Sequence, residues 1–208
     1  MTVKKFLAGP LGTNCYLLVN EISKEALIVD PASCPERLKE CVAKDNIRIR
    51  AILLTHAHFD HIMGIDDVIG LYGEMPVYVH QEDMEMLENP ALNLSGNYGM
   101  GYSYRGGTAI RDGQILSLIG YEIKVIHTPG HTPGGVCYYV ESEEVLISGD
   151  TLFQDSVGRT DFPGGSASEL VRSIKEKLFV LPENTHVYPG HMGTTTIWHE
   201  KGHNPFVY

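Results

Sequence analysis

Histidine and aspartate side chains gather in one short stretch of the chain, AILLTHAHFDHIMG over residues 51–64. His56, His58, Asp60 and His61 lie close together directly behind an apolar run. A motif of this spacing arises by chance in roughly one chain in a thousand of this composition. Imidazole nitrogens and carboxylate oxygens are ligands that zinc and similar divalent ions take from proteins. The stretch therefore predicts a metal site where a strand ends.

Three later segments repeat the pattern of an apolar strand, a tight turn and a side chain able to bind metal. They are YEIKVIHTPGH, ending at His131, EVLISGD, ending at Asp150, and THVYPGH, ending at His191. Two of the turns use a Pro-Gly-His step, in which proline fixes φ and glycine permits backbone angles that other residues avoid. Taken singly, each residue is more typical of a turn, cap or core position. Their shared turn chemistry favours convergence at one edge of a sheet.

The seven candidate ligands are too many for one ion, because zinc takes about four. We therefore expect two divalent ions that share a bridging hydroxide. One division assigns His56, His58 and His131 to the first ion and Asp60, His61 and His191 to the second, with the Asp150 carboxylate bridging both. The other five histidines, which are His80, His127, His186, His199 and His203, are predicted to be structural, packing or surface residues.

The apolar runs and turns predict strands and helices in two roughly similar halves. Strands are expected at 14–20, 26–30, 49–55, 76–80, 114–119, 121–127, 135–141, 144–148 and 185–189, and helices at 35–45, 62–73, 81–89, 166–180 and around 194–200. Ser166 or Ser168 is expected to cap the helix over 166–180. Residues 89–108 are rich in Gly, Asn, Ser and Tyr, so we expect a long loop, with 93–107 as a mobile lid at the site mouth. The element order favours one domain over residues 1–208, with two sheets face to face and helices outside.

The composition argues against several classes of function. The 208 residues carry a net charge of −10, with 16 basic against 26 acidic residues, which disfavours nucleic-acid binding. No apolar run approaches the roughly 20 residues that cross a bilayer, so no membrane partner is expected. The 4 cysteines are scattered without a CxxC pair, which is typical of reduced thiols in the cytoplasm. The sequence leaves the oligomeric state open.

Four motifs together carry a resemblance to a known family. THAHFDH, TPGHTPG, SGDTLF and YPGH, in this order, resemble the metallo-β-lactamase fold superfamily, and within it the glyoxalase II group of hydroxyacylglutathione hydrolases. The chain is similar to a short form without the C-terminal helical region that helps to bind glutathione. The resemblance implies a four-layer αββα sandwich and a dinuclear centre, commonly of zinc and sometimes of iron or manganese, held by the seven positions above. It also implies that Asp150 is a bridging carboxylate of the hydrolase branch, which true β-lactamases lack.

The expected activity is hydrolysis of a small-molecule thioester, with Asp60 and Asp150 as the catalytic carboxylates of the centre. Metal-activated hydroxide would attack the thioester carbonyl, and a thiol with a pKa of about 8.5 leaves without a general acid. The segment GRTDF (158–162) also resembles the persulfide dioxygenases, which use one iron held by two histidines and an aspartate. The complete set of seven ligands favours the hydrolase. A lactonase or nuclease of the same fold is less favoured.

Two residues in the segment that follows Asp150, Arg159 and Phe162, are candidates for binding substrate. The net charge of −10 repels anions at long range, so an acidic substrate would need a local cation in the site to offset this repulsion. Arg159 is the expected cation. Phe162 lies in the same segment. The alternative for Arg159 is a surface salt bridge with Asp155 or Asp161.

Overall fold

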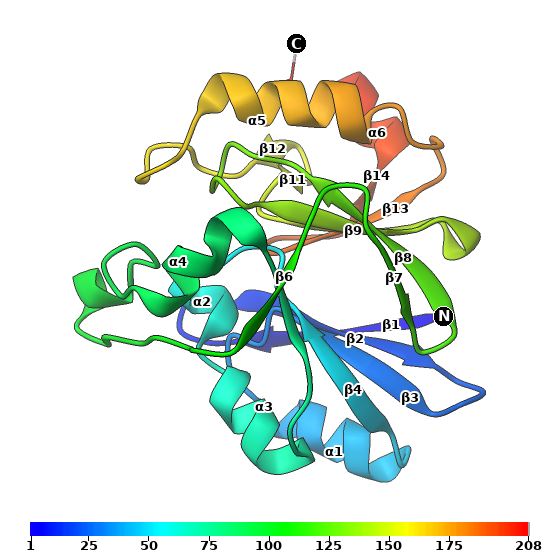
Figure 1. Cartoon of the computed structure of the whole chain (residues 1–208). Helices are drawn as coiled ribbons and strands as arrows, with labels where there is room; N and C mark the ends of the chain where they lie inside the picture. The colour runs from blue at the N-terminus through cyan, green and yellow to red at the C-terminus, as the bar shows by residue number, and fades with distance from the viewer. Residues whose placement is uncertain (208) are drawn as a thin grey trace.

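The computed structural model describes residues 1–207 and contains two six-stranded sheets that pack face to face between outer layers of helices (Figure 1). The strand order is β1-β2-β3-β4-β5-β6 in the first sheet and β14-β13-β10-β9-β8-β7 in the second. Helices α1 and α3 cover the outer face of the first sheet, and α5 and α6 cover the second. The predicted α/β fold, a four-layer αββα sandwich, is confirmed.

The first sheet contains β1 (Thr2–Ala8), β2 (Thr13–Asn20), β3 (Glu25–Val29), β4 (Arg48–Leu53), β5 (Val77–His80) and β6 (Gly107–Ile110). The second contains β7 (Ile115–Leu118), β8 (Tyr121–His127), β9 (Val136–Val140), β10 (Val145–Gly149), β13 (His186–Pro189) and β14 (Thr195–Thr196). A small hairpin is formed by β11 (Leu152–Phe153) and β12 (Ser156–Val157). The helices are α1 (Glu36–Lys44), α2 (Phe59–Ile62), α3 (Ile65–Tyr72), α4 (Met84–Glu88), α5 (Ala167–Ser173), which continues as a π-helical segment (Ile174–Leu178), and α6 (Ile197–His203). Short 3₁₀ turns span Gln81–Asp83, Ser95–Tyr98 and Glu141–Glu143.

Both faces of the inner strands are buried, which explains their nearly continuous apolar sequences. In β2, Cys15 and Leu17 belong to the core under the outer helices, whereas Tyr16 and Leu18 belong to the core between the two sheets. The alternation follows from the period of two of a strand. Apolar residues on both faces therefore hold the sheets rigidly between two helical layers.

The carboxyl ends of several parallel strands meet at one edge of the sandwich. Strands β3, β4, β5 and β6 are parallel neighbours, and β10 is parallel to β13. Ligand sites in sheets with parallel strands form outside these ends. The segments that leave β3, β4, β10 and β13 contain Asp30, His56, Asp150 and His191.

Some predicted elements differ from those observed. The first strand, β1, was not predicted, yet it pairs with β2 over its whole length as an edge strand. The helix predicted over 62–73 is divided at Gly64, where a Cβ would lie 2.5 Å from the Pro31 carbonyl oxygen. Of the two predicted caps, Ser166 accepts a hydrogen bond from the Glu169 backbone N–H. None of the described helices is both long and apolar enough to span a membrane.

Candidate metal centre

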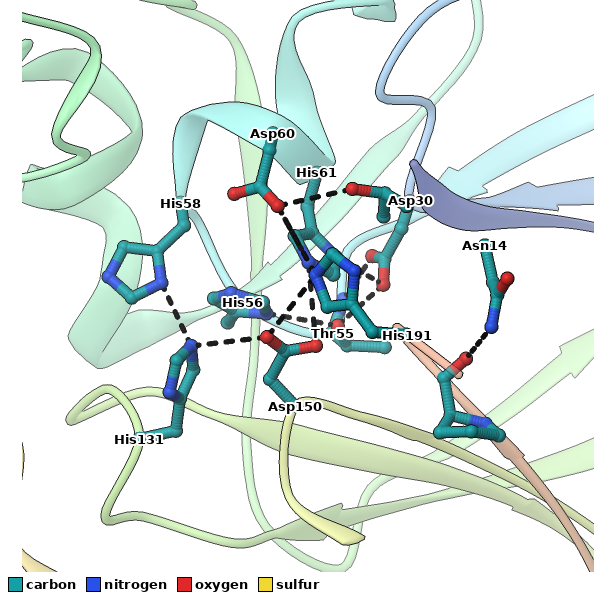
Figure 2. A network of polar contacts seen from close by, with 12 residues as sticks. Asn14, Asp30, Thr55, His56, His58, Asp60, His61, His131, Asp150 and His191 are labelled. Carbon is teal, nitrogen blue, oxygen red and sulfur yellow. Dashed lines mark hydrogen bonds and ion pairs between the residues drawn. The ribbon is translucent and has the colours of Figure 1, made fainter. Parts of the chain in front are cut away.

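The seven predicted ligands converge at the edge where the parallel strands end (Figure 2). His56 follows β4, and the α2 segment supplies the next three, with His58 as its N-cap and Asp60 and His61 inside its single turn. His131, Asp150 and His191 arrive from turns of the second half of the chain. The short helix α2 therefore faces three separate turns at this edge of the sandwich.

The first group of side chains consists of His56, His58 and His131, whose nitrogen atoms lie within 4.8 Å of one another. The His58 Nδ1 and His131 Nε2 atoms are 2.9 Å apart. Neighbouring ring nitrogens at this distance share either a proton or a cation. The group contains no carboxylate.

The second group consists of Asp60, His61 and His191, also with ligand atoms within 4.8 Å. Asp60 Oδ2 lies 3.3 Å from His191 Nε2 and 3.6 Å from His61 Nε2. This group brings together an anionic side chain and two imidazoles.

The Asp150 carboxylate lies between the two groups (Figure 2). Its Oδ1 atom is 3.5 Å from His61 Nε2, and its Oδ2 atom is 3.6 Å from both His131 Nε2 and His191 Nε2. Asp150 therefore faces the first group through His131 and the second group through His61 and His191. That Asp150 bridges two ions stays a prediction, and a position between the two groups is what it requires.

Unpaired buried atoms indicate that the centre is built for cations. His56 Nε2, His61 Nε2 and Asp150 Oδ1 are buried without a hydrogen-bond partner. Such atoms are costly unless something else satisfies them. Tetrahedral zinc with bonds of about 2.0–2.2 Å places its ligand atoms about 3.4 Å apart, close to the separations around Asp150. The donor set and its spacing fit divalent ions.

Asp30 and Thr55 orient two of the rings from behind. Asp30 Oδ2 lies 2.9 Å from His61 Nδ1 and accepts a hydrogen bond from Thr55 Oγ1 at 2.6 Å. Thr55 Oγ1 is also 3.2 Å from His56 Nδ1. Because their Nδ1 atoms are held here, both rings direct Nε2 into the centre. Neither residue was predicted, although Asp30 also ends an apolar strand, ALIVD.

Two further anchors were missed in the sequence. Thr13 Oγ1 donates a hydrogen bond to Asp60 Oδ2 at 3.1 Å. The buried Asp83 carboxylate accepts from the backbone N–H groups of Ala57 and Gly134 and from the Thr132 hydroxyl. Asp83 thus ties the histidine-rich segment to the His131 turn. A single carboxylate without characteristic spacing gives no sequence signal for this role.

Burial and charge set different protonation states in the two groups. Burial, reinforced by neighbouring histidines, lowers the pKa of His56 and His58 well below its usual value, so both rings are neutral. Burial also lowers the pKa of His61, but Asp60, Asp150 and Asp30 overcome it and raise that pKa to about 10. Burial opposes ionisation of Asp60, yet His61 and His191 hold its pKa below the usual range.

The two Pro-Gly-His turns use glycine for different reasons. Gly130 has a φ of +135°, and a Cβ there would lie 2.3 Å from the Leu170 nitrogen. Gly190 has no left-handed φ, so the expectation of unusual backbone angles is wrong for that turn. Its glycine permits close approach instead, since a Cβ would lie 2.2 Å from Asp150 Oδ1.

A cavity of about 370 Å³ opens beside the centre. Five of the candidate ligands reach it, namely His58, Asp60, His131, Asp150 and His191. Most of the remaining lining is apolar or aromatic and consists of Leu11, Phe59, Leu94, Tyr98, Phe153, Val157, Phe162 and Met192, with Ser156 and Arg159 as the polar members. A substrate in this cavity would contact the centre directly.

Arg159 and Phe162, the two candidates for binding substrate, both line the cavity. The Arg159 guanidinium forms two hydrogen bonds with the Asp161 carboxylate, at 2.9 and 2.7 Å, so the alternative ion pair is present. The same guanidinium lies 4.4 Å from the centroid of the Phe162 ring. The Arg159 backbone carbonyl accepts a hydrogen bond from His131 Nδ1 at 2.6 Å.

The 93–107 loop lies at the mouth of the cavity, where Leu94 and Tyr98 contribute to the lining. Its base is firmly anchored, because Asn93, Leu94 and Ser95 are buried. The Asn93 amide and the Ser95 hydroxyl both donate hydrogen bonds to the Tyr102 carbonyl. The mobility of the loop stays a prediction.

Among the five histidines outside the centre, His80, His127 and His199 contact another histidine or a carboxylate. His80 is buried and stacks on His127 with ring centroids 4.0 Å apart. His199 pairs with Asp155 at 2.7 Å. These contacts fit structural or surface roles.

Comparison with known proteins found relatives that match most or all of the chain. A family model described as the metallo-beta-lactamase superfamily matches residues 8–191. The probable metallo-hydrolase YqgX of Bacillus subtilis is 38% identical over 209 residues, covering 100% of this chain and 98% of the relative. Hydroxyacylglutathione hydrolase GloC of Haemophilus influenzae is 32% identical, covering 93% of this chain and 92% of the relative.

Solved structures share the same architecture. The BLEG-1 B3 metallo-beta-lactamase is 42% identical, with a TM-score of 0.93 and 99% of each chain covered. TTHA1623, solved in a di-iron-bound form, is 34% identical with a TM-score of 0.86, covering 98% of this chain and 99% of the other. ETHE1 from Myxococcus xanthus is 27% identical with a TM-score of 0.81, covering 100% of this chain and 84% of the other.

Proposed function

Because the chain belongs to the metallo-β-lactamase superfamily and is a metallo-hydrolase of that group, we propose that its reaction is the hydrolysis of a small-molecule thioester. The observation that carries the proposal is the placement of two groups of metal-binding side chains around one shared carboxylate, Asp150. Similarity to hydroxyacylglutathione hydrolase GloC favours a thioester as the substrate.

The proposed cofactor is a pair of divalent ions. We assign His56, His58 and His131 to one ion and Asp60, His61 and His191 to the other, with Asp150 between them. Zinc suits the mixed nitrogen and oxygen donors. Iron and manganese are alternatives, and the di-iron-bound form of TTHA1623 supports iron. Bound divalent ions lower the pKa of water from 15.7 to about 7, which supplies hydroxide at neutral pH.

The residues of the chain would position the reacting groups. His56 and His58 are held neutral, the form in which imidazole donates a lone pair, and Asp60 and Asp150 bring negative charge to the centre. Hydrolysis forms a bond from water oxygen to the carbonyl carbon and breaks the carbon–sulfur bond, giving a carboxylic acid and a thiol. A thiol of pKa about 8.5 leaves as thiolate without a proton donor. Within residues 1–207, the cavity lining contains no lysine, glutamate or cysteine for that role.

The test is thiol release by purified full-length protein, measured after loading with zinc, iron or manganese. The substrates would be hydroxyacyl and simple acyl thioesters of several thiols. We expect release that a chelator abolishes and added metal restores. A fully loaded protein that cleaves none of these thioesters would contradict the proposal.

β-Lactam hydrolysis is a second candidate, which the 42% identity to the BLEG-1 B3 metallo-beta-lactamase favours. This relationship reopens a substrate class that Asp150 was expected to disfavour. An amine is a poorer leaving group than a thiolate, so β-lactam cleavage calls for a proton at the nitrogen. A chromogenic β-lactam assayed beside the thioesters separates the two.

The persulfide dioxygenase alternative rests on GRTDF (158–162). A single iron held by two histidines and one aspartate would leave several of the seven side chains without a role. Oxygen uptake with a persulfide substrate would favour it.

We also propose a cytoplasmic location, because all four cysteines, which are Cys15, Cys34, Cys41 and Cys137, are free.

A further inference from the structure

We propose that the substrate is a thioester with an apolar acyl chain on an uncharged thiol, and that the cavity has no receptor for an anionic carrier such as glutathione. The inference rests on the proposed thioester hydrolysis and names its substrate class. It follows from the lining of the cavity, from the pairing of Arg159, and from the position of Phe162.

The cavity is apolar beyond the metal centre. Phe59, Phe153 and Val157 form buried or half-buried walls, and none of them offers a side-chain hydrogen bond. The apolar surface continues outward to the rim, where Leu11 and Met192 are 50% and 58% exposed. An acyl chain longer than the cavity would thus remain on apolar surface as it leaves.

The basic side chain at the cavity is already paired. Arg159 is the one lysine or arginine that lines the cavity within residues 1–207. The Arg159 guanidinium donates two hydrogen bonds to the Asp161 carboxylate, whose negative charge offsets the positive charge of Arg159. Lys5 lies outside the lining and donates a hydrogen bond to the Met192 carbonyl at 3.4 Å. Within the lining, an anionic carrier would lose solvent without gaining a lysine or arginine that is free of a carboxylate partner.

The Arg159 side chain has another task, which is to support an aromatic wall. Its guanidinium lies over the face of Phe162 at 4.4 Å. The Phe162 ring in turn meets the His58 ring edge-on, with centroids 5.4 Å apart. The Asp161–Arg159–Phe162 stack therefore places an apolar surface directly against a ligand of the first group.

The first experiment varies the acyl chain and the thiol separately. Acetyl, butyryl and hexanoyl esters of N-acetylcysteamine, an uncharged thiol, would be compared with hexanoyl- and lactoylglutathione on metal-loaded protein. We expect kcat/KM to rise up to about fourfold for each added methylene, corresponding to about 0.8 kcal/mol. We also expect hexanoyl-N-acetylcysteamine to exceed both glutathione esters by at least about tenfold.

The outcomes separate this inference from the function on which it rests. Thioester cleavage with a flat or falling acyl series, or with glutathione preferred, contradicts the substrate class and leaves thioester hydrolysis standing. A fully metal-loaded protein that cleaves no thioester contradicts both proposals.

Variants test the pairing of Arg159. Asp161→Asn frees the guanidinium, so we expect kcat/KM for hexanoylglutathione to rise severalfold relative to the neutral ester. Glu21→Gln removes the same charge from the exposed Glu21–Lys24 pair and should not change the ratio. Arg159→Gln should keep the ratio within about twofold, with metal content measured for every variant. A tenfold loss for the glutathione ester alone in Arg159→Gln would establish Arg159 as an anion receptor and overturn the inference.

Discussion

The two groups of metal-binding side chains differ in charge and exposure. His56, His58 and His131 are all imidazoles, and burial holds the first two neutral. The second group includes the Asp60 carboxylate, and the side chain of its His191 is 24% exposed, compared with 6% for His131.

For the proposed pair of ions, the difference predicts unequal binding. An ion entering the first group meets the His56 and His58 rings, which burial keeps neutral. An ion entering the second must displace the proton that carboxylates hold on His61. We therefore expect the first position to load more readily and the second to depend on Asp60 and Asp30.

The largest effect is expected from Asp150→Ala, because this carboxylate faces both groups. Metal content should fall at both positions, and kcat/KM should fall by more than about a hundredfold, beyond the 10–100-fold typical of losing an outer partner. Elemental analysis and thiol release measure the two losses. Retention of both ions with near-normal turnover would show that Asp150 does not bridge.

Asp60→Ala should affect metal binding by the second group only. It removes the only carboxylate of the second group, so that group should empty while the first keeps its ion. Metal content should approach one ion per chain. His58→Ala is the matched variant, and loss of the same ion in both variants would contradict two distinct positions.

Asp30→Asn should act through His61 without touching an ion. An amide can turn its N–H toward His61 Nδ1 and favour the wrong tautomer, so affinity at the second position should fall about 10–100-fold. Competition with a chromophoric chelator measures this. An equal loss at the first position would indicate a general folding defect, which circular dichroism would detect.

Lowering the pH should weaken the second position before the first. The pKa of His61 is raised to about 10, so below that value its proton competes with the ion. Affinity should fall about tenfold per pH unit between pH 8 and 6 at the second position. His56 and His58, whose pKa is lowered, stay neutral over that range. Parallel losses at both positions would remove the proposed distinction.

The smallest effect concerns the loop at the cavity mouth. Amides at its buried base, residues 93–95, should exchange slowly, and those of Ser103, Arg105 and Gly106 quickly, since these residues are exposed and lie beyond the hydrogen-bonded turn at 95–101. A bound product should slow exchange at the tip. Uniformly slow exchange without ligand would contradict a lid.

The sequence predicted the candidate ligands better than the residues that orient and anchor them. His56, His58 and His61 could be found because their type and spacing form a rare pattern, and His131 and His191 because they share a turn. Asp30 and Asp83 could not be found, since each acts alone through contacts that only the folded chain creates. For Arg159 the sequence left two alternatives, because the geometry of Asp161 decides whether its charge is free.

The fold followed from patterns of the same kind. Strands buried on both faces, such as β2, have continuous apolar sequences that indicate a sandwich. The edge strand β1 carries two lysines and, apart from Ala8, only half-buried or exposed residues, so it lacks that signal. Gly64 divides the predicted helix over 62–73 because the chain passes close to Pro31, a contact that local sequence does not encode.

The central claim is a pair of ions shared by Asp150, and the most direct test is a crystal structure of the zinc-loaded protein with anomalous scattering. We predict two zinc peaks per chain, about 3.5–4 Å apart, with an Asp150 oxygen bound to both. One peak should contact His56, His58 and His131, and the other Asp60, His61 and His191. A single peak in fully loaded protein, with His191 unbound, would contradict the account.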